Sequence, residues 1–407
     1  MNILHINQSD ISGGAAIAGY RLHQELLAQG IDSKILVGTS KTDSDFIADI
    51  PRRQTVDKIL NRITSNLGFN YISLLSSFGI PRHQFYQDAD ILNFHNLHTG
   101  YFNYLAIPKL TENKPTIYTL HDMWSFTGHC AYSYDCSKWK TGCGKCPYPD
   151  TYPSISFDNT HLEWKLKKWI YSKSSLFIVS PSTWLTEQAK ASMLGQFPIY
   201  HIANGIDTSL YQPLDRSLCR VSLALPQDKR VILFGAETLK DGRKGGDLLI
   251  NALERLPSSL KAEIVLVTFG FGAKPVSSIP TVNLGYISSD RLKSLVYSAA
   301  DLFIFPTRAD NLPLVLQESM ACGTPMVSFN VGGVPDLVRH MITGYLAKSE
   351  DIEDFGNGIV TLLEDQNLRD QMSERCRDIA VKEYNLTMQT RQYVELYQKI
   401  LNSSASN

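Results

Sequence analysis

Two acidic side chains, Asp310 and Glu318, are separated by a largely apolar run, and a Gly-Thr-Pro sequence follows at 323–325. The strand-like segment Leu302–Phe305 precedes them. A loop that leads into a helix here would direct backbone N–H groups and the positive end of the helix dipole at a ligand. One carboxylate would lie before the helix and the other within its first turns. This geometry suits a ligand with both phosphate and hydroxyl groups, such as a sugar nucleotide.

A second candidate segment, 235–246, combines glycines with the cations Lys240, Arg243 and Lys244. It follows the predicted strand Arg230–Phe234. Binding of a phosphate group requires such charge together with accessible backbone N–H groups. The segment is therefore a candidate phosphate site, and an exposed basic turn is the alternative interpretation.

The first predicted strand is followed by Gly13 and Gly14 and then by two alanines. Glycines permit close approach of a ligand to the backbone, and the alanines would begin a helix. The pattern differs from G-x-G-x-x-G, which disfavours a nicotinamide dinucleotide. A Gly-Gly pair is also common in plain turns.

Polar residues at three other positions are further candidates. His121 lies at the carboxyl end of a predicted strand, where it could bind a sugar hydroxyl or a carbonyl-like oxygen; capping of the strand end is the alternative. The segment Asn93–His98, which contains two histidines, is a weaker candidate of the same kind. Asn204, in an Asn-Gly-Ile-Asp sequence, either forms a turn or lends a polar contact to a ligand.

Four of the seven cysteines, Cys130, Cys136, Cys143 and Cys146, lie in one short segment. Their spacing, C-x5-C-x6-C-x2-C, is compatible with a tetrahedral zinc site. Four thiolates would leave no open coordination position, so such a zinc would be structural. Two disulfides or unpaired thiols in a compact loop are the alternatives.

Short apolar strands alternate with helical patterns along most of the chain, which predicts doubly wound α/β sheets. Continuous apolar runs indicate parallel strands that are buried on both faces. The polar segment Asp207–Asp228 is predicted to be a linker between two series of strands. We therefore expect two Rossmann-like domains that face a central cleft, with ligands at the carboxyl ends of the strands. The predicted strands are Asn2–Ile6, Ser33–Val37, Ile91–Phe94, Thr116–Leu120, Leu176–Val179 and Pro198–Ile202, then Arg230–Phe234, Ala262–Phe269, Thr281–Leu284, Leu302–Phe305, Pro325–Phe329 and Gly344–Ala347.

The composition sets further limits. A chain of 407 residues suggests two or three domains, and a net charge of −1 gives no global field that would attract nucleic acid. Neither a signal peptide nor a membrane-spanning run is expected, and an odd number of cysteines favours the cytoplasm. Two segments, Thr55–Gly79 and His161–Trp169, have the mixture of apolar and basic residues that suits peripheral contact with the inner face of a membrane. Ordinary surface helices look similar.

Taken together, these residues resemble the retaining glycosyltransferases of family 4, which have the GT-B fold. The segment 120–147, with its cysteines, is similar to a subgroup that includes colanic-acid-type surface-polysaccharide transferases. The resemblance implies an N-terminal acceptor-side domain over residues 1–205, a C-terminal donor-binding domain over 206–385, and a helix at about 386–407 that packs back on the first domain. The matching motifs are Gly13-Gly14, His121-Asp122, Pro181–Trp184, Asn204–Asp207, Lys244-Gly245 and Asp310 to Glu318.

The resemblance also implies roles for individual residues. Glu318 would bind the ribose, and Asp310, shorter than the family's usual glutamate, would face the donor sugar. Lys244 would bind phosphate, with Arg243 or Lys240 in place of an arginine that the family carries where this chain has Ala236. The remaining donor contacts would be Gly13 and Gly14 beside the diphosphate, His121 near the anomeric carbon, Asn204, Tyr286 near the base, and the backbone of Asn311, Leu312 and Pro313.

The activity implied is transfer of a hexose-type sugar from a nucleotide-diphosphate sugar to a glycan or lipid-linked acceptor, without a catalytic metal. Two alternatives are open. A nucleotide-sugar epimerase shares the GT-B architecture, and a non-catalytic scaffold would bind the sugar nucleotide without turnover.

Overall fold

The computed structural model describes residues 1–51, 57, 59, 60, 62, 64, 68–272 and 278–405. Part of the predicted membrane-contact segment Thr55–Gly79 lies outside the described residues. The chain forms two compact units, one made of Met1–Asn204 and Gln389–Asn407 and the other of Gly205–Met388. Compared with the predicted domain limits, the first boundary differs by one residue and the second by three.

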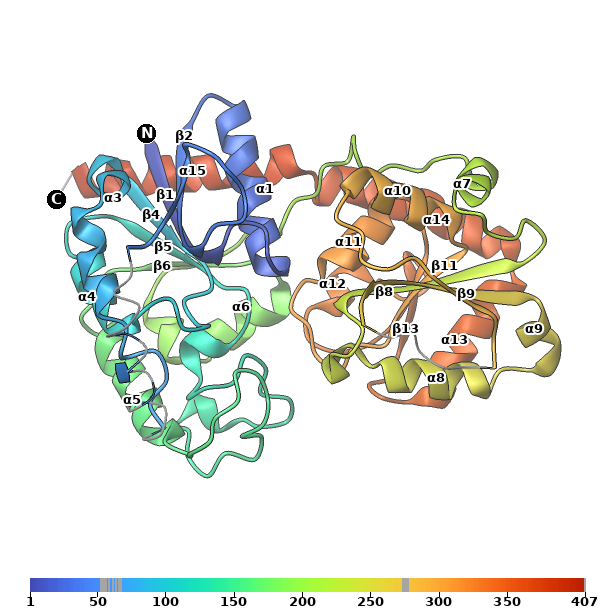
Figure 1. Ribbon diagram of the computed structural model, residues 1–407, viewed down its shortest axis with the longest axis horizontal. Coiled ribbons are helices and arrows are strands. Elements are labelled where there is room, and N and C mark those ends of the chain that lie inside the picture. The colour runs from blue at the N-terminus through green and yellow to red at the C-terminus, as the bar shows by residue number, and fades with distance from the viewer. Residues whose placement is uncertain are drawn as a thin grey trace. The chain divides into compact units, whose positions relative to one another are not determined.

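The first unit is built on a seven-stranded parallel sheet of order β3-β2-β1-β4-β5-β6-β7 (Figure 1). The order reverses direction between β1 and β4, which makes that point the topological switch point of the sheet. Its strands are β1 (Asn2–Ser9), β2 (Asp32–Thr39), β3 (Ile47–Asp49), β4 (Ile91–Phe94), β5 (Thr116–Thr119), β6 (Phe177–Ser180) and β7 (Ile199–His201). Its helices are α1 (Gly14–Ala28), α3 (Gln84–Asp88), α4 (Ile107–Thr111), α5 (Thr160–Tyr171), α6 (Thr183–Lys190) and α15 (Leu386–Ala405), with 3-10 turns η1 (Leu75–Arg82), η2 (Tyr104–Ala106), η3 (Trp124–Phe126), η4 (Lys138–Lys140) and η5 (Met193–Gln196).

The second unit has a six-stranded parallel sheet of order β10-β9-β8-β11-β12-β13, with its switch point between β8 and β11. Its strands are β8 (Arg230–Thr238), β9 (Ile264–Phe271), β10 (Thr281–Asn283), β11 (Leu302–Phe305), β12 (Met326–Phe329) and β13 (Gly344–Ala347). Its helices are α7 (Arg216–Ser222), α8 (Gly246–Glu254), α9 (Ser258–Ala262), α10 (Asp290–Ala299), α11 (Leu314–Ala321), α12 (Val334–Leu337), α13 (Ile352–Glu364) and α14 (Gln366–Glu383), with one 3-10 turn, η6 (Gly242–Lys244).

All twelve predicted strands are present, and the sequence missed only the edge strand β3 among the strands described. Every residue of the central strands β4, β5, β11 and β12 is buried. Burial on both faces by covering helices explains why these strands appear in the sequence as continuous apolar runs. The doubly wound α/β prediction is confirmed for both units.

The predicted linker Asp207–Asp228 is wrong, because this segment is an ordered part of the second unit. It contains α7, and Tyr211 is fully buried. The Arg220 guanidinium donates to Asp301 Oδ2 at 2.7 Å. A polar segment thus packs through an ion pair that composition alone does not reveal.

The last helix, α15, completes the core of the first unit although it comes after the second unit in the chain (Figure 1). Four buried side chains of α15 pack against strands of the first sheet and against α1. These side chains are Tyr393, Leu396, Tyr397 and Ile400. The Tyr397 hydroxyl accepts a hydrogen bond from Asn93 Nδ2 at 3.1 Å, and the Tyr393 hydroxyl lies 3.0 Å from Thr119 Oγ1. These polar contacts fix the position of the helix on the sheet.

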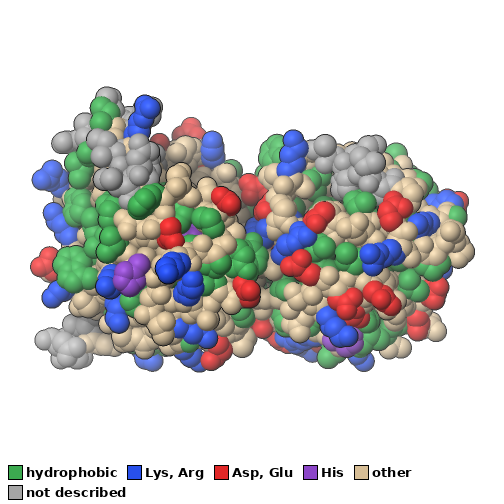
Figure 2. Space-filling view, turned by 90° about the horizontal axis from the view of Figure 1, so that it is seen from below, with side chains coloured by type: hydrophobic (Ala, Val, Ile, Leu, Met, Phe, Trp, Pro, Cys, Tyr) green, Lys and Arg blue, Asp and Glu red, His purple; other side chains and the backbone are tan. Residues whose placement is uncertain are grey.

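Basic and acidic side chains are interspersed over the face shown in Figure 2, in keeping with the net charge of −1. Of the helices in the described ranges, none combines the length and the apolar character that crossing a bilayer requires.

Candidate active site

In the second unit, the loop after β8 brings Arg243 and Lys244, two of the three candidate cations, to the switch point. It passes through η6 into α8, and Asp241 accepts a hydrogen bond from the backbone N–H of Arg243 at 2.9 Å. Gly245 has φ of 72°, and a Cβ atom there would lie 1.9 Å from the carbonyl oxygen of Pro306. Only glycine permits this contact between the loop after β8 and the loop after β11.

Asp310, in the loop after β11, binds both cations. Its Oδ2 atom accepts from Lys244 Nζ in a short ion pair and lies 3.2 Å from Arg243 Nη1. Arg243 also donates to the carbonyl oxygen of Ala309 at 2.8 Å. Burial alone would raise the pKa of Asp310, but the charges of Lys244 and Arg243 outweigh it and hold that pKa below its usual range. The carboxyl group is therefore ionised at neutral pH.

The loop after β12 supports Asp310 from the other side. Gly333 donates its N–H to the Asp310 carbonyl at 3.1 Å. A Cβ atom on Gly332, which has φ of 54°, would lie 2.0 Å from the same oxygen. The loop after β8 thus binds the carboxylate of Asp310, and the loop after β12 binds its backbone carbonyl.

Glu318 lies in α11 and is almost fully buried, at 3% exposure. Its Oε2 atom accepts a hydrogen bond from the Tyr297 hydroxyl of α10 at 3.1 Å. The sequence did not single out Tyr297, because nothing around it distinguishes it from a core aromatic residue. The sequence did place Asp310 before the helix and Glu318 inside it, as observed.

The turn into α11 consists of Asn311, Leu312 and Pro313. The first two are buried, and Pro313 is the residue that precedes the helix, which begins without a side-chain cap. The first N–H groups of α11 therefore lie close to Asp310 in the chain.

Two further donor-site predictions fall in the second unit. Tyr286, just after β10, stacks on Phe271 at the end of β9, with ring centroids 4.0 Å apart and planes 11° apart. Both rings are about half exposed, at 48% and 52%. Ala236 is buried within β8, and Arg243 rather than the exposed Lys240 reaches Asp310.

In the first unit, Gly13 and Gly14 form the turn from β1 into α1. Gly13 precedes the helix with φ of 91°, and Gly14 is exposed. The buried Asp10 holds the turn by accepting from the backbone N–H groups of Ile11 and Thr42 at 3.0 and 2.8 Å. The turn is therefore anchored to the segment after β2. Asn204 is buried and ends the continuous first part of this unit.

His121 lies just beyond β5 and takes part in a row of imidazoles. Its Nε2 atom lies 3.0 Å from His95 Nδ1, and His95 Nε2 lies 3.0 Å from His5 Nδ1. Burial lowers the pKa of His121 to about 4, so the ring is neutral at physiological pH. The next residue, Asp122, pairs with His98 Nε2 at 2.8 Å.

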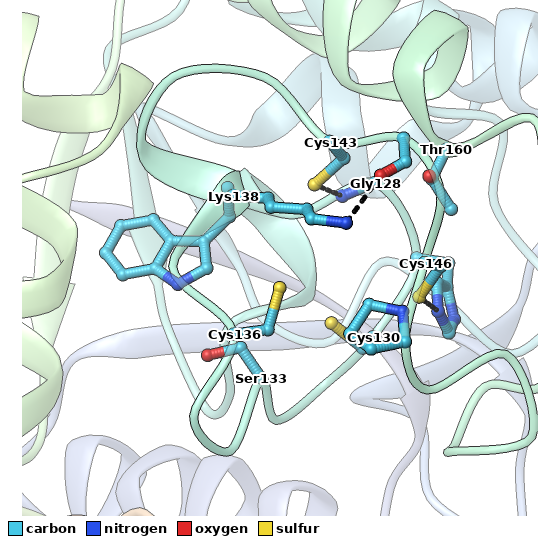
Figure 3. Close-up of a pocket in the computed structure, with 12 residues that line it drawn as sticks. Gly128, Cys130, Ser133, Cys136, Lys138, Cys143, Cys146 and Thr160 are labelled. Atoms are coloured by element: carbon cyan, nitrogen blue, oxygen red, sulfur yellow. Dashed lines mark hydrogen bonds between the residues drawn. The ribbon is translucent and has the colours of Figure 1, made fainter.

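The four clustered cysteines surround a cavity of ≈ 20 Å³ (Figure 3). Cys143 Sγ accepts from the Gly128 N–H at 3.2 Å, and Cys146 Sγ lies 3.1 Å from His129 Nε2. All seven thiols of the chain are free, so the disulfide alternative is not supported. Within the described residues, no three His, Cys, Asp or Glu side chains are placed to hold one metal ion.

The structure thus brings Arg243, Lys244 and Asp310 together at the switch point of the second unit, with Glu318 in the helix that follows. Gly13, Gly14, His121 and Asn204 belong to the first unit. Both groups lie at the carboxyl ends of parallel strands, where ligands bind in open α/β sheets.

Comparison with known proteins agrees with this architecture. The profile of Glycosyltransferase Family 4 matches residues 12–210, and that of Glycosyl transferases group 1 matches residues 215–378. The putative colanic acid biosynthesis glycosyl transferase WcaC of Escherichia coli K12 is 29% identical over 347 residues, which cover 81% of this chain and 83% of WcaC.

Solved structures show the same fold. Sucrose-phosphate synthase from Thermosynechococcus elongatus superposes with a TM-score of 0.72 at 17% identity, over 99% of this chain and all of that one. Anabaena HepE in complex with UDP-glucose gives a TM-score of 0.68 at 16% identity, over 98% of this chain and all of HepE.

Two parallel α/β units with candidate residues at their switch points define a glycosyltransferase with the GT-B fold. Its first unit carries a glycosyltransferase family 4 domain and its second unit a group 1 domain. Neither the epimerase nor the non-catalytic scaffold finds support in these matches.

Proposed function

We propose that this enzyme transfers a hexose-type sugar, with retention of configuration, from a nucleoside-diphosphate donor to a glycan or lipid-linked acceptor. The observation that carries the proposal is the pairing of Lys244 and Arg243 with Asp310 beside the start of α11. The UDP-glucose bound by HepE supports a nucleotide-sugar donor. The name of WcaC supports a role in surface-polysaccharide assembly.

The chemistry follows from the charges that develop during transfer. As the sugar–phosphate bond breaks, negative charge accumulates on the diphosphate and positive charge on the anomeric carbon. Lys244, Arg243 and the N–H groups at the start of α11 would stabilise the leaving diphosphate. Glu318, held by Tyr297, would accept hydrogen bonds from the ribose hydroxyls. With two cations at the diphosphate, we infer that transfer needs no metal ion.

The test measures donor binding and transfer in Lys244→Ala and Glu318→Gln. Both variants should lose at least about 100-fold in kcat/KM, which corresponds to ~2.7 kcal/mol of transition-state stabilisation. The matched controls are Lys382→Ala and Glu364→Gln, which change exposed side chains of the same unit. Folded Lys244→Ala and Glu318→Gln proteins with normal turnover would refute the assignment. Screening UDP- and GDP-sugars by thermal stabilisation identifies the donor.

We also propose that the four-cysteine cavity holds a structural zinc ion. The support is that all four thiols line one small cavity, and four thiolates are a common zinc ligand set. Zinc binding would draw the thiols closer together than they lie in this structure. Mass spectrometry of the purified protein should find one zinc per chain, with loss in Cys136→Ser and Cys143→Ser. Cys219→Ser, a buried cysteine of the second unit, is the control and should keep the metal. A wild-type protein without zinc would exclude the site.

Finally, we propose that the protein works in the cytoplasm and contacts the inner face of the membrane through α5. The seven free thiols support a reducing compartment. Leu162 and Trp169 on α5 are about half exposed, at 48% and 57%, and lie next to the exposed Lys165 and Lys168. Sedimentation with vesicles containing anionic lipid should retain the wild type and release Trp169→Ser, whereas neutral vesicles should retain neither. Equal recovery with both vesicle types would argue against the contact.

A further inference from the structure

The row of imidazoles behind His121 runs from the core of the first unit to the carboxyl edge of its sheet. His5 lies in β1, His95 follows β4 and His121 follows β5, and these three strands are adjacent. In both neighbouring pairs the ring centroids are 5.3 Å apart and the closest nitrogens 3.0 Å apart. Both contacts are therefore nitrogen-to-nitrogen hydrogen bonds.

The inner end of the row is closed. His5 is 1% exposed and His95 2% exposed. A Cβ atom on Gly19 of α1 would lie 3.4 Å from His95 Cε1, so the helix packs tightly over this ring. No described residue offers His5 Nε2 a hydrogen-bond partner. The nearby His23 ring, 6.3 Å from His5, bonds Ser33 Oγ through Nδ1.

These facts restrict where the hydrogens lie. A neutral imidazole has one N–H donor and one acceptor nitrogen, so all hydrogens in the row must point in the same direction. If they point outward, His5 Nδ1–H donates to His95 and His95 Nδ1–H donates to His121 Nε2. The only unpaired group in the row is then the lone pair of His5 Nε2. If they point inward, the unpaired group is a buried N–H, and buried N–H groups without an acceptor are rarer than acceptors without a donor.

We propose that the row fixes His121 as the neutral tautomer with its hydrogen on Nδ1, and that His95 is the residue that sets it. His121 Nε2 then accepts from His95 and does not act as a base. The hydrogen of the ring is then carried by Nδ1. In the transfer reaction this donor would suit a sugar hydroxyl or a developing negative oxygen, a use that rests on the proposed function. The tautomer itself does not.

The test is the nitrogen spectrum of histidine side chains in the full-length protein. With ¹⁵N-labelled imidazoles, two-bond ¹H–¹⁵N correlations distinguish Nδ1–H from Nε2–H rings, and ten histidines are few enough to assign by substitution. At neutral pH and without donor, we expect His121 to show the Nδ1–H pattern. An Nε2–H pattern in the wild type would overturn the proposal, whatever the enzyme's activity.

Two variants distinguish an effect of the hydrogen bonds in the row from an effect of ring packing alone. In His95→Phe the donor to His121 is lost, so the spectrum should show a mixture of tautomers, and kcat should fall about tenfold with a smaller change in the donor KM. In His5→Phe the preferred direction remains, because His95 still ends in an unpaired lone pair, so His121 should keep its Nδ1–H form. The exposed His201→Gln is the control. If His121 keeps an unchanged Nδ1–H pattern in His95→Phe, His95 does not set the tautomer. If the His95→Phe protein fails to fold, the wild-type spectrum still decides which tautomer His121 adopts.

Discussion

Asp310 shares one carboxylate oxygen between Lys244 and Arg243, and this arrangement changes how its role is understood. The family resemblance assigned the aspartate to the sugar and the cations to the phosphate, as separate contacts. In the structure the three side chains form one cluster. The sequence could predict each residue, but not the cluster, because it depends on the packing of Gly245 against Pro306 and of Gly332 against Asp310.

We predict that Asp310→Asn binds free UDP or GDP about fivefold more tightly (~1 kcal/mol) while transfer falls. The carboxylate competes with a diphosphate for the two cations, and the amide does not. Titration calorimetry measures the affinity, and Asp378→Asn, an exposed aspartate paired with Lys382, is the control. Weaker nucleotide binding by Asp310→Asn would contradict this competition.

A second prediction concerns Tyr297, whose hydroxyl orients Glu318. Tyr297→Phe should weaken nucleotide binding by about three- to tenfold, the value of one hydrogen bond. The loss should be less than additive with Glu318→Gln, because both variants weaken the same contact between residue 318 and the ribose. Tyr345→Phe removes a similar bond to Asp354 elsewhere in the unit and should leave binding unchanged. Additive losses would show that the two residues act separately.

At the scale of elements, the strands were predictable because burial on both faces gives continuous apolar runs. The edge strand β3, with only three residues, is too short for such a signal. The segment around α7 was mistaken for a linker because its buried contact is an ion pair of Arg220 with Asp301, 81 positions along the chain. The imidazole row could not be predicted for a similar reason. In the sequence His5 is an isolated polar residue of a strand, and the row forms only because β4 and β5 lie beside β1 in the sheet.

The contact between α15 and the first sheet gives a third prediction. Tyr397→Phe leaves the buried Asn93 Nδ2 without its acceptor and should cost about 1–3 kcal/mol of unfolding free energy. Urea denaturation measures the loss. Tyr200→Phe on β7 of the same sheet should change the free energy by no more than about 0.5 kcal/mol. Equal stability of the Tyr397→Phe protein and the wild type would mean that the hydroxyl does not anchor the helix.

For the whole molecule, the buried histidines make stability depend on pH. Burial lowers the pKa of His5 to about 3 and those of His23 and His121 to about 4. The unfolded chain binds protons at these sites from the ordinary value of 6.5 downward, whereas the folded protein does not. Their stabilising effect is complete above pH 6.5 and is lost as the pH falls toward 4, at about 1.4 kcal/mol per pH unit for each histidine.

We therefore expect the melting temperature to fall steeply between pH 6.5 and 5, before the carboxyl groups titrate. Scanning calorimetry over this range measures the slope, which should be smaller in a folded His5→Phe protein and unchanged in His201→Gln. A melting temperature that is constant from pH 7 to 5 would rule out this contribution.

The place of α15 has a consequence for biosynthesis. The sheet of the first unit is complete once the ribosome has passed Asn204, but the helix that covers one of its faces is made only after the entire second unit. Until then, the apolar surface around Ile3, Ile117 and Val179 lacks its final cover. The second unit can therefore fold first, and the nascent first unit must wait while Gly205–Met388 are synthesised, exposed to aggregation and to chaperones.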